Sequence, residues 1–253
     1  MSLEDITIII PTFHRRGYLA ECFRAIEANL PECQVVVAQD DGGGCTYENH
    51  TLWAKLPYDS GLTAKRNAAV RLVETKYALM GCDDFDFSTP EVRKGIENMS
   101  MLKYHPGISL VAGRVNNRPY EGYLEYVPGE YIKEHRLVEM PLGFNEGLSS
   151  RVYRVDIAAN YFLARTKVLK EIPWDENIRP IGGEHVDWFL DLKAANKVVA
   201  FLPSVNINTQ PFDYSKQDPR YREFRQRALT TGHALMMKKR NIQEYFGFDQ
   251  EVC

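Results

Sequence analysis

The stretch Tyr77-Ala78-Leu79-Met80-Gly81-Cys82-Asp83-Asp84-Phe85-Asp86-Phe87 decides the fold, because an apolar run ends here in a cluster of carboxylates. The apolar residues predict a buried strand. Like charges as close as those of Asp83, Asp84 and Asp86 repel one another unless a positive group lies between them. Because α/β folds place ligands at the ends of parallel strands, a hard divalent cation held by carboxylate oxygens would account for the cluster. The alternative is a solvated acidic turn.

Two strands and a helix precede this stretch. Residues 6–10 form a β-branched run that stops at Pro11, residues 17–29 have a helical pattern, and residues 34–38 form a second apolar run. This spacing predicts a right-handed βαβ unit in a parallel sheet. A short strand at 52–56 and a helix opened by residues 61–67 then lead into the acidic stretch.

The remainder of the chain predicts further helices and strands. Helices are expected over 90–102, 166–171 and 184–195, with a long basic helix or helix pair over 219–239. Strands are expected at 108–112, 155–158, 161–164, 198–202 and 205–207, and residues 113–151 predict a β-rich excursion that covers the site. We expect a single domain over residues 1–253, with a boundary between its two halves near residue 113.

The composition is that of an ordinary globular protein, with 44% hydrophobic and 26% charged residues. A net charge of −3 predicts neither a nucleic-acid binder nor a membrane-surface protein as a whole. No apolar run is long enough to span a membrane, and the N-terminus does not resemble a signal peptide. The five cysteines lack a Cys-x-x-Cys pair, so we expect free thiols in a reducing, cytoplasmic compartment.

Polar residues follow the second strand and open the next helix. The carboxylates of Asp40 and Asp41 can accept hydrogen bonds from a ribose or a base, although an Asx turn explains them equally well. Lys65, Arg66 and Asn67 stand at a helix start, where a cation suits a diphosphate. The alternative is a solvated helix face.

The helix expected from Glu184 has an acidic face behind the paired glycines Gly182-Gly183. Glu184, Asp187 and Asp191 fall on that face, which suits a general base and a hydrogen-bond acceptor. The alternative is an ordinary amphipathic helix with an acidic first turn. His185 is open between a metal ligand, a base and a residue on the flank of the helix.

The C-terminal region is basic and contains interleaved aromatic residues. Such a surface suits a phosphate-rich partner, whereas a solvated helix face is the alternative. The residues that would contact DNA in that case are Arg220, Arg222, Arg225, Arg227, Lys238, Lys239 and Arg240.

The order of these motifs resembles the family-two glycosyltransferases of GT-A fold. The motifs are Pro11-Thr12, Asp40-Asp41-Gly42, residues 61–67, residues 83–86, residues 160–165 and Gly183-Glu184-His185-Val186-Asp187. The segments 161–166 and 183–189 are most similar to the branch of the ganglioside-type β-1,4-N-acetylgalactosaminyltransferases. This resemblance implies a Rossmann-like α/β fold with a mixed, mainly parallel sheet flanked by helices. Residues 5–112 would form the nucleotide-sugar half, 113–210 the acceptor half, and 211–253 a basic helical extension.

The resemblance also implies a reaction, namely transfer of a sugar from a nucleotide diphosphate donor, usually a UDP-sugar, with Mn²⁺ or Mg²⁺ on the diphosphate. Asp84 would be the first metal ligand, with Asp86 and His185 as further candidates. Cys82 stands where the family often has a first Asp, which leaves the usual metal geometry open. The donor would contact Pro11, Thr12, Asp40, Asp41, Arg66, Asn67 and Asp83.

On the acceptor side, the resemblance implies that Asp187 or Glu184 deprotonates the acceptor hydroxyl and that the anomeric carbon is inverted. Asn160, Gly183 and Trp188 are expected near the acceptor. Asn206 and Asn208 stand where family members often supply a histidine to the metal, so the third ligand is open.

Three interpretations of the function follow. In the first, the acceptor is a glycan, a lipid or a small hydroxyl compound in the cytoplasm of a bacterium or a virus-infected cell. In the second, the acceptor is 5-hydroxymethylcytosine or a related hydroxymethylpyrimidine in DNA, and the base would have to be flipped out of the duplex. The third interpretation is an inactive module that binds a sugar nucleotide or a glycan. A nucleotidyltransferase is disfavoured, because residues 11–16 lack a glycine-rich loop.

Overall fold

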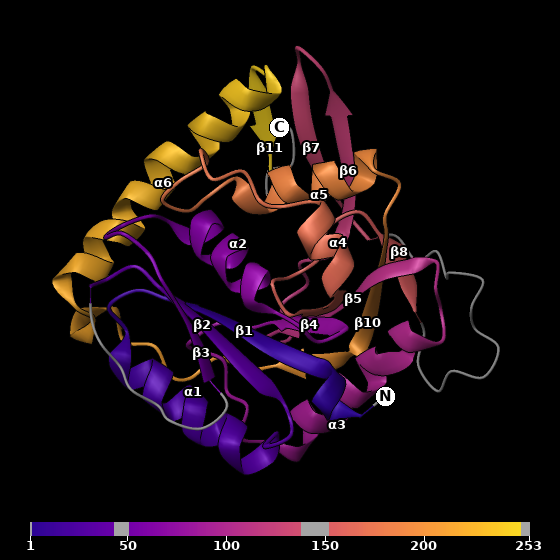
Figure 1. Cartoon of the computed structure of the whole chain (residues 1–253). Helices are drawn as coiled ribbons and strands as arrows, with labels where there is room; N and C mark the ends of the chain where they lie inside the picture. Colours follow the sequence, from indigo (N-terminus) through magenta and orange to yellow (C-terminus); the bar gives the residue numbers. More distant parts are fainter. Residues whose placement is uncertain (1, 43–50, 138–151, 249–253) are drawn as a thin grey trace.

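Side chains of the first strand alternate between two hydrophobic cores, one on each face of the central sheet. The computed structural model describes residues 2–42, 51–137 and 152–248. In β1 (Ile6–Thr12), Ile8 and Ile10 pack into one core and Ile9 packs into the other. The first face is covered by α1 (Arg16–Asn29) and α3 (Pro90–Met99), and the second by α2 (Leu62–Leu72), α4 (Thr166–Glu171) and α5 (Glu184–Ala194) (Figure 1). The described chain therefore has three layers, as the sequence predicts.

The central sheet is mixed and mainly parallel in its N-terminal half. Its strand order is β3-β2-β1-β4-β9-β5-β10-β8. The strands are β2 (Gln34–Gln39), β3 (Thr51–Lys55), β4 (Tyr77–Met80), β5 (Ile108–Val115), β8 (Tyr153–Val155), β9 (Phe162–Arg165) and β10 (Val198–Ile207). The pairs β1/β2, β1/β4, β2/β3 and β5/β10 are parallel, whereas β9 is antiparallel to both of its neighbours. Because β4 neighbours β1, the acidic stretch lies beside the residues that follow β1.

A second sheet and a long helix complete the described chain. The second sheet has the order β11-β7-β6, with β6 (Gly122–Val127), β7 (Tyr131–Arg136) and β11 (Glu244–Phe246). The basic C-terminal segment forms a single helix, α6 (Pro219–Arg240), which runs along one side of the molecule past α2 and α5 (Figure 1). The strand β11 that follows α6 pairs with β7. The predicted extension is thus integrated into the fold at its C-terminal end.

Several predicted boundaries need correction. The two strands predicted at 198–202 and 205–207 form the single strand β10, whose register shifts between Phe201 and Asn206 because Pro203 lacks an amide to donate. The strand predicted at 155–158 ends at Val155, where Asp156 turns its carboxylate to the amide of Leu124. The helix predicted to reach residue 102 ends at Met99 and continues as a 3₁₀ turn. The division near residue 113 falls inside β5, so both halves share this strand.

Of the predicted β-rich excursion, the described part contains the hairpin of β6 and β7, and residues 138–151 lie outside the described residues. The described cysteines Cys22, Cys33 and Cys82 are free thiols, as predicted.

Helix α6 crosses the start of α5 at a pair of glycines. A Cβ atom added to Gly232 would overlap the carbonyl oxygen of Gly182. Gly183 has a φ of 81°, and a Cβ there would lie 2.9 Å from the Cβ of Met236. The backbones of α5 and α6 therefore approach too closely for any side chain at these positions.

We predict that Gly232→Ala lowers the free energy of unfolding by about 3 kcal/mol, because the overlap involves backbone atoms that a side-chain rotation does not relieve. Chemical denaturation measures this change. Gly17→Ala is the matched control, because a Cβ on Gly17 meets nothing within 4 Å, and alanine in a helix is favoured over glycine by about 0.5–1 kcal/mol. Equal stability of both variants would contradict the close crossing.

Candidate active site

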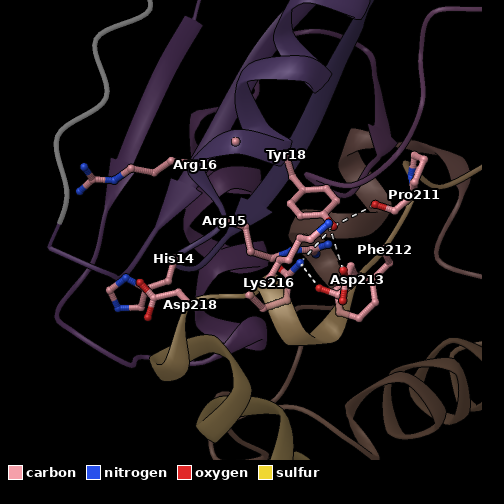
Figure 2. A pocket seen from close by; sticks show the side chains of 11 residues that line it. His14, Arg15, Arg16, Tyr18, Pro211, Phe212, Asp213, Lys216 and Asp218 are labelled. Atoms are coloured by element: carbon pink, nitrogen blue, oxygen red, sulfur yellow. Dashed lines mark hydrogen bonds and ion pairs between the residues drawn. The ribbon is translucent and has the colours of Figure 1, made fainter.

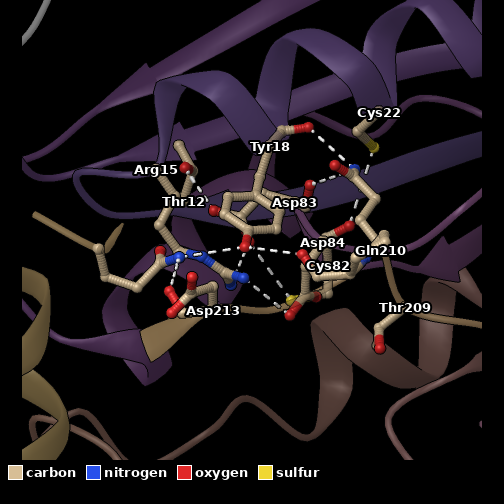
Figure 3. A network of polar contacts seen from close by, with 12 residues as sticks. Thr12, Arg15, Tyr18, Cys22, Cys82, Asp83, Asp84, Thr209, Gln210 and Asp213 are labelled. Atoms are coloured by element: carbon tan, nitrogen blue, oxygen red, sulfur yellow. Dashed lines mark hydrogen bonds and ion pairs between the residues drawn. The ribbon is translucent and has the colours of Figure 1, made fainter. Parts of the chain in front are cut away.

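The acidic stretch holds a buried arginine between two of its carboxylates. Asp83 and Asp84 follow β4, and Arg15 follows the neighbouring β1. The Arg15 guanidinium donates from Nη1 to Asp83 at 2.8 Å and from Nη2 to Asp84 at 2.9 Å (Figure 3). Thr12 donates its hydroxyl to the other oxygen of Asp83 at 2.7 Å. The positive group that the sequence requires between these carboxylates is thus supplied by the chain itself.

Burial shapes the electrostatics of this pair. Asp83 is 2% exposed, and this burial raises its pKa to about 6, although Arg15 favours the charged form. The Asp84 side chain is 20% exposed and accepts from the Arg15 side chain. Asp84 is therefore the carboxylate of the pair that is open to an incoming ligand.

The donor atoms at this position fit a hard divalent cation. Cys82 Sγ and one carboxylate oxygen each from Asp83 and Asp84 lie within 4.8 Å of one another. The two carboxylates provide the oxygen ligands that Mn²⁺ and Mg²⁺ prefer. Burial raises the pKa of the Cys82 thiol, which keeps it protonated and a poor ligand.

The other two metal candidates lie apart from this group. Asp86 accepts hydrogen bonds from the amide and hydroxyl of Ser88, at 2.9 and 2.6 Å. His185 is on α5 and bonds through Nε2 to the carbonyl oxygen of Ala158 at 2.6 Å. Among the described residues, neither belongs to a cluster with the spacing of metal ligands.

The residues predicted for the nucleoside gather at the ends of β1 and β2. Asp40 is fully buried and accepts from Lys65 Nζ at 2.7 Å and from the Gly61 amide at 3.0 Å. Asp41 accepts from the amide of His14. Pro11 and Thr12 are buried at the end of β1. The structure therefore brings these predicted residues together at one edge of the sheet, where α/β folds bind ligands.

Aromatic residues of α6 cover this edge. Tyr221 and Phe224 form a small hydrophobic cluster with Phe13, and the rings of Phe13 and Phe224 are 5.0 Å apart. Lys65 Nζ lies 5.4 Å from the centre of the Phe224 ring. Phe224 thus lies over the cation that binds Asp40, and both Asp40 and Thr12 are buried.

The start of α2 is buried rather than solvated. Arg66 is 3% exposed, and among its guanidinium atoms Nε and Nη1 have no hydrogen-bond partner. Nη1 lies 3.6 Å from Glu184, and the guanidinium lies 5.4 Å from the centre of the Trp174 ring. A buried cation with unused donors suits an anionic group, as predicted for the diphosphate.

Asn67 requires a correction. Its amide nitrogen donates to the carbonyl oxygen of Trp174 at 2.8 Å and to Glu176 at 3.0 Å, and its oxygen accepts from the Trp174 amide. These bonds involve both the amide nitrogen and the amide oxygen of the side chain. Asn67 therefore fixes the segment around Trp174 instead of contacting the nucleotide-sugar donor.

Asp187 is tied to α6. Lys239 donates to one carboxylate oxygen at 2.8 Å, Arg240 donates to the other at 2.6 Å, and Arg240 also binds Asp191 at 2.7 Å. Asp187 is 1% exposed. Both of its oxygens are therefore occupied by ion pairs between α5 and α6, an arrangement that favours a structural role over the predicted role as a base.

Two of the three predicted acceptor contacts are corrected as well. Gly183 makes room for α6, as described above, and not for a ligand. Trp188 is 1% exposed, stacks on Trp174 with ring centres 4.4 Å apart, and donates to the carbonyl oxygen of Ile172. Asn160 is half-buried, precedes β9 with Tyr161 in between, and stays a prediction.

Glu184 and His185 lie at the start of α5, beside Arg66. Glu184 accepts from the Gly182 amide at 2.5 Å and faces Arg66 with its other oxygen. Burial lowers the pKa of His185 to about 3, and the neighbouring Arg66 acts in the same direction. His185 is therefore neutral at physiological pH, and its Nδ1 has no hydrogen-bond partner.

Four of the basic residues of α6 pair with carboxylates of the chain. Lys239 and Arg240 bind the acidic face of α5, Arg227 pairs with Asp59 at 2.6 Å, and Arg220 pairs with Asp218 at 2.7 Å. The DNA interpretation needs these charges for phosphates, and they are committed to carboxylates of the chain instead. Arg225 and Lys238 are exposed, whereas Arg222 is half-buried.

The sequence did not predict that Arg15 pairs with the acidic stretch or that aromatic residues of α6 cover this edge of the sheet. Arg15 lines a cavity of about 450 Å³ together with His14, Tyr18, Phe212 and Lys216 (Figure 2). Tyr18 and Tyr221 contribute rings 4.5 and 4.8 Å from its guanidinium carbon. One signal could have indicated this role. Arg15 follows β1 at the same edge of the sheet where the carboxylates follow β4.

The chain is similar to several known proteins. No family model matches the chain. The chain is 27% identical over 208 residues to β-1,4 N-acetylgalactosaminyltransferase 2 of Mus musculus, covering 81% of this chain and 39% of that protein. It is 29% identical over 202 residues to β-1,4 N-acetylgalactosaminyltransferase 1 of Homo sapiens, covering 74% of this chain and 35% of that protein. The chain thus spans little more than a third of the length of these relatives.

Two solved structures share the fold. The structure of GalNAc-T7 with UDP, GalNAc and Mn²⁺ superposes with a TM-score of 0.62 at 10% identity, over 85% of this chain and 44% of that one. The structure of S. aureus TarS 1–349 with UDP superposes with a TM-score of 0.51 at 14% identity, over 81% of this chain and 60% of that one. The mixed sheet with its flanking helices is accordingly a GT-A fold. Among the described residues, no helix combines the length and the apolar character needed to cross a membrane.

Proposed function

We propose that this chain, a GT-A glycosyltransferase related to the β-1,4-N-acetylgalactosaminyltransferases, transfers a sugar from a UDP-sugar to an acceptor hydroxyl. The observation that carries the proposal is the pairing of Asp83 and Asp84 with Arg15 at the end of β4. Carboxylates and a cation meet there at the edge of the sheet where a nucleotide diphosphate would lie. The relatives named above support a sugar nucleotide as the donor.

Asp83 and Asp84 would hold Mn²⁺ or Mg²⁺ through their carboxylate oxygens. When bound, the ion stabilises the negative charge that develops on the leaving diphosphate. Arg66 would also bind the diphosphate, because its unused donors are already buried and lose little water when an anion arrives. Asp40 would accept a hydrogen bond from the nucleoside once the cover from α6 has moved.

We assign the general base to Glu184. Its Oε1 lies 3.6 Å from Arg66, beyond hydrogen-bond distance, whereas both oxygens of Asp187 accept hydrogen bonds from α6 at 2.6 and 2.8 Å. Proton transfer from the acceptor hydroxyl to Glu184 accompanies attack on the anomeric carbon, the bond to the diphosphate breaks, and the sugar configuration is inverted.

We predict that Glu184→Gln lowers kcat about 10²–10⁴-fold, the usual contribution of a positioned general base, with donor binding retained. Steady-state release of UDP measures kcat, and calorimetry measures UDP affinity. Glu176→Gln is the matched control, because Glu176 is exposed and takes no part in the proposed reaction. Unchanged kcat in Glu184→Gln would assign the base elsewhere.

A panel of nucleotide sugars tests the proposed function without knowledge of the acceptor. A ligand that binds only the folded state raises its stability, by about 2.7 kcal/mol at a concentration of 100 Kd. We expect UDP-sugars with Mn²⁺ to raise Tm more than the same sugars with a chelator, and UMP to have a smaller effect than UDP. Failure of every nucleotide sugar to raise Tm, with and without Mn²⁺, would contradict the proposal.

A further inference from the structure

We propose that Arg15 is a built-in counter-ion of Asp83 and Asp84 that competes with the divalent cation, so that the cation binds tightly only together with the donor diphosphate. The inference rests on the proposed function and concerns the order in which its ligands bind. It assigns to Arg15 a role that the motifs of the sequence do not indicate.

The position of Arg15 carries the first step. Its two terminal nitrogens bridge the two carboxylates at 2.8 and 2.9 Å, and the donor atoms of Asp83, Asp84 and Cys82 lie within 4.8 Å of one another. The guanidinium occupies one oxygen of each carboxylate, and Thr12 occupies the other oxygen of Asp83, so few of the lone pairs that a hard cation would require stay free at Asp83. Two positive ions next to the same carboxylates also repel each other. Arg15 and a divalent cation therefore compete for this pair.

The surroundings keep Arg15 in place. It is 6% exposed, and the rings of Tyr18 and Tyr221 lie 4.5 and 4.8 Å from its guanidinium carbon. Gln210, which follows β10, donates its side chain to the carbonyl oxygens of Tyr18 and Asp83 and its amide to that of Asp84. The acidic pair and its arginine are thus held together by α1, α6 and the segment after β10, as Figure 3 shows for all but α6.

A diphosphate provides the means of release. It offers Arg15 an anionic partner of the same kind as a carboxylate, with which guanidinium groups form bidentate hydrogen bonds. Once Arg15 turns to the diphosphate, its positive charge no longer offsets the negative charge of Asp83 and Asp84, and these carboxylates attract the cation. Binding of UDP and binding of the cation then favour each other, and this coupling is reciprocal.

Binding of Mn²⁺, followed by electron paramagnetic resonance of the free ion, tests the inference without turnover. We expect Arg15→Gln to bind Mn²⁺ alone at least about ten-fold more tightly than the wild type, because the competing charge is gone. Arg15→Lys, which keeps the charge but cannot bridge both carboxylates, should fall between them. Arg16→Gln is the matched control, because it removes the same charge from an exposed neighbour in the chain and should leave the Mn²⁺ affinity unchanged.

The same titration with UDP completes the test. UDP should raise the Mn²⁺ affinity of the wild type by a larger factor than that of Arg15→Gln. The role of Arg15 would be overturned if Arg15→Gln and Arg15→Lys bound Mn²⁺ no more tightly than the wild type, in samples that unfold cooperatively above the temperature of the titration. That result would leave the proposed function intact. Absence of Mn²⁺ binding in every variant, with and without UDP, would overturn both the inference and the metal-dependent reaction.

Discussion

Asp84→Asn is expected to lower the rate of UDP release about 10²–10³-fold, which is the usual effect of removing one electrostatic group that stabilises a transition state. Asp84 is the more exposed carboxylate of the pair, and its side chain accepts a hydrogen bond from Arg15. The substitution preserves the shape of the side chain and removes the charge that would hold the cation. The folded state should therefore persist, and the loss should appear in kcat/KM for the donor.

Asp86→Asn is the matched control for this prediction. Asp86 lies in the same acidic stretch, but its carboxylate accepts from Ser88 and does not join the cluster of possible ligands. We expect activity within about three-fold of the wild type, because no transition-state charge is removed. If Asp86→Asn inactivates the enzyme and Asp84→Asn does not, the metal ligands have been assigned to the wrong carboxylates.

Asp187→Ala is expected to lower the free energy of unfolding by about 3 kcal/mol, because it removes the buried anion of the ion-pair network between α5 and α6, although Asp191 still pairs with Arg240 and Asp175 with Lys239. For a chain of this length, such a loss lowers Tm by about 10 °C. Arg240→Met should also be destabilising, but by less, since Lys239 still pairs with Asp187. Thermal and chemical unfolding measure these changes.

A double-mutant cycle separates the structural role of Asp187 from a catalytic one. The combined variant Asp187→Ala with Arg240→Met should lose less stability than the sum of the single variants, with a coupling energy of about 1–3 kcal/mol. A catalytic base would behave differently, because its removal would lower kcat at a temperature where the variant is fully folded and would leave Tm near that of the wild type. That result would restore Asp187 as the base.

Local patterns predicted the strands of the N-terminal half and the edge of the sheet at which the acidic stretch lies. The β-branched runs identify β1 and β2, and the carboxylates after β4 lie at the predicted edge of the sheet. This works because strand formation and burial leave a direct trace in the order of apolar and polar residues. The pairing of Arg15 with Asp83 depends in addition on β1 and β4 being neighbours, which no local pattern specifies.

The role of α6 could not be predicted for a related reason. Its helical pattern is clear, but periodicity identifies an apolar face without identifying what that face contacts. Phe224 packs on Phe13, more than 200 residues earlier in the chain. The prediction of Gly183 as an acceptor contact has the same limit. A glycine that admits a ligand and a glycine that admits a helix satisfy the same steric requirement, so the sequence does not distinguish them.

Release of UDP from UDP-sugars, measured with purified protein, Mn²⁺ and a set of hydroxyl acceptors, tests the central claim most directly. We predict release that requires the divalent cation, that increases with a suitable acceptor, and that falls about 10²–10³-fold in Asp84→Asn. Two results would contradict the assignment of a sugar transferase centred on Asp83 and Asp84. One is release of UDP that is as fast in Asp84→Asn as in the wild type. The other is no release from any UDP-sugar with any acceptor in the set, while Mn²⁺ and UDP fail to bind.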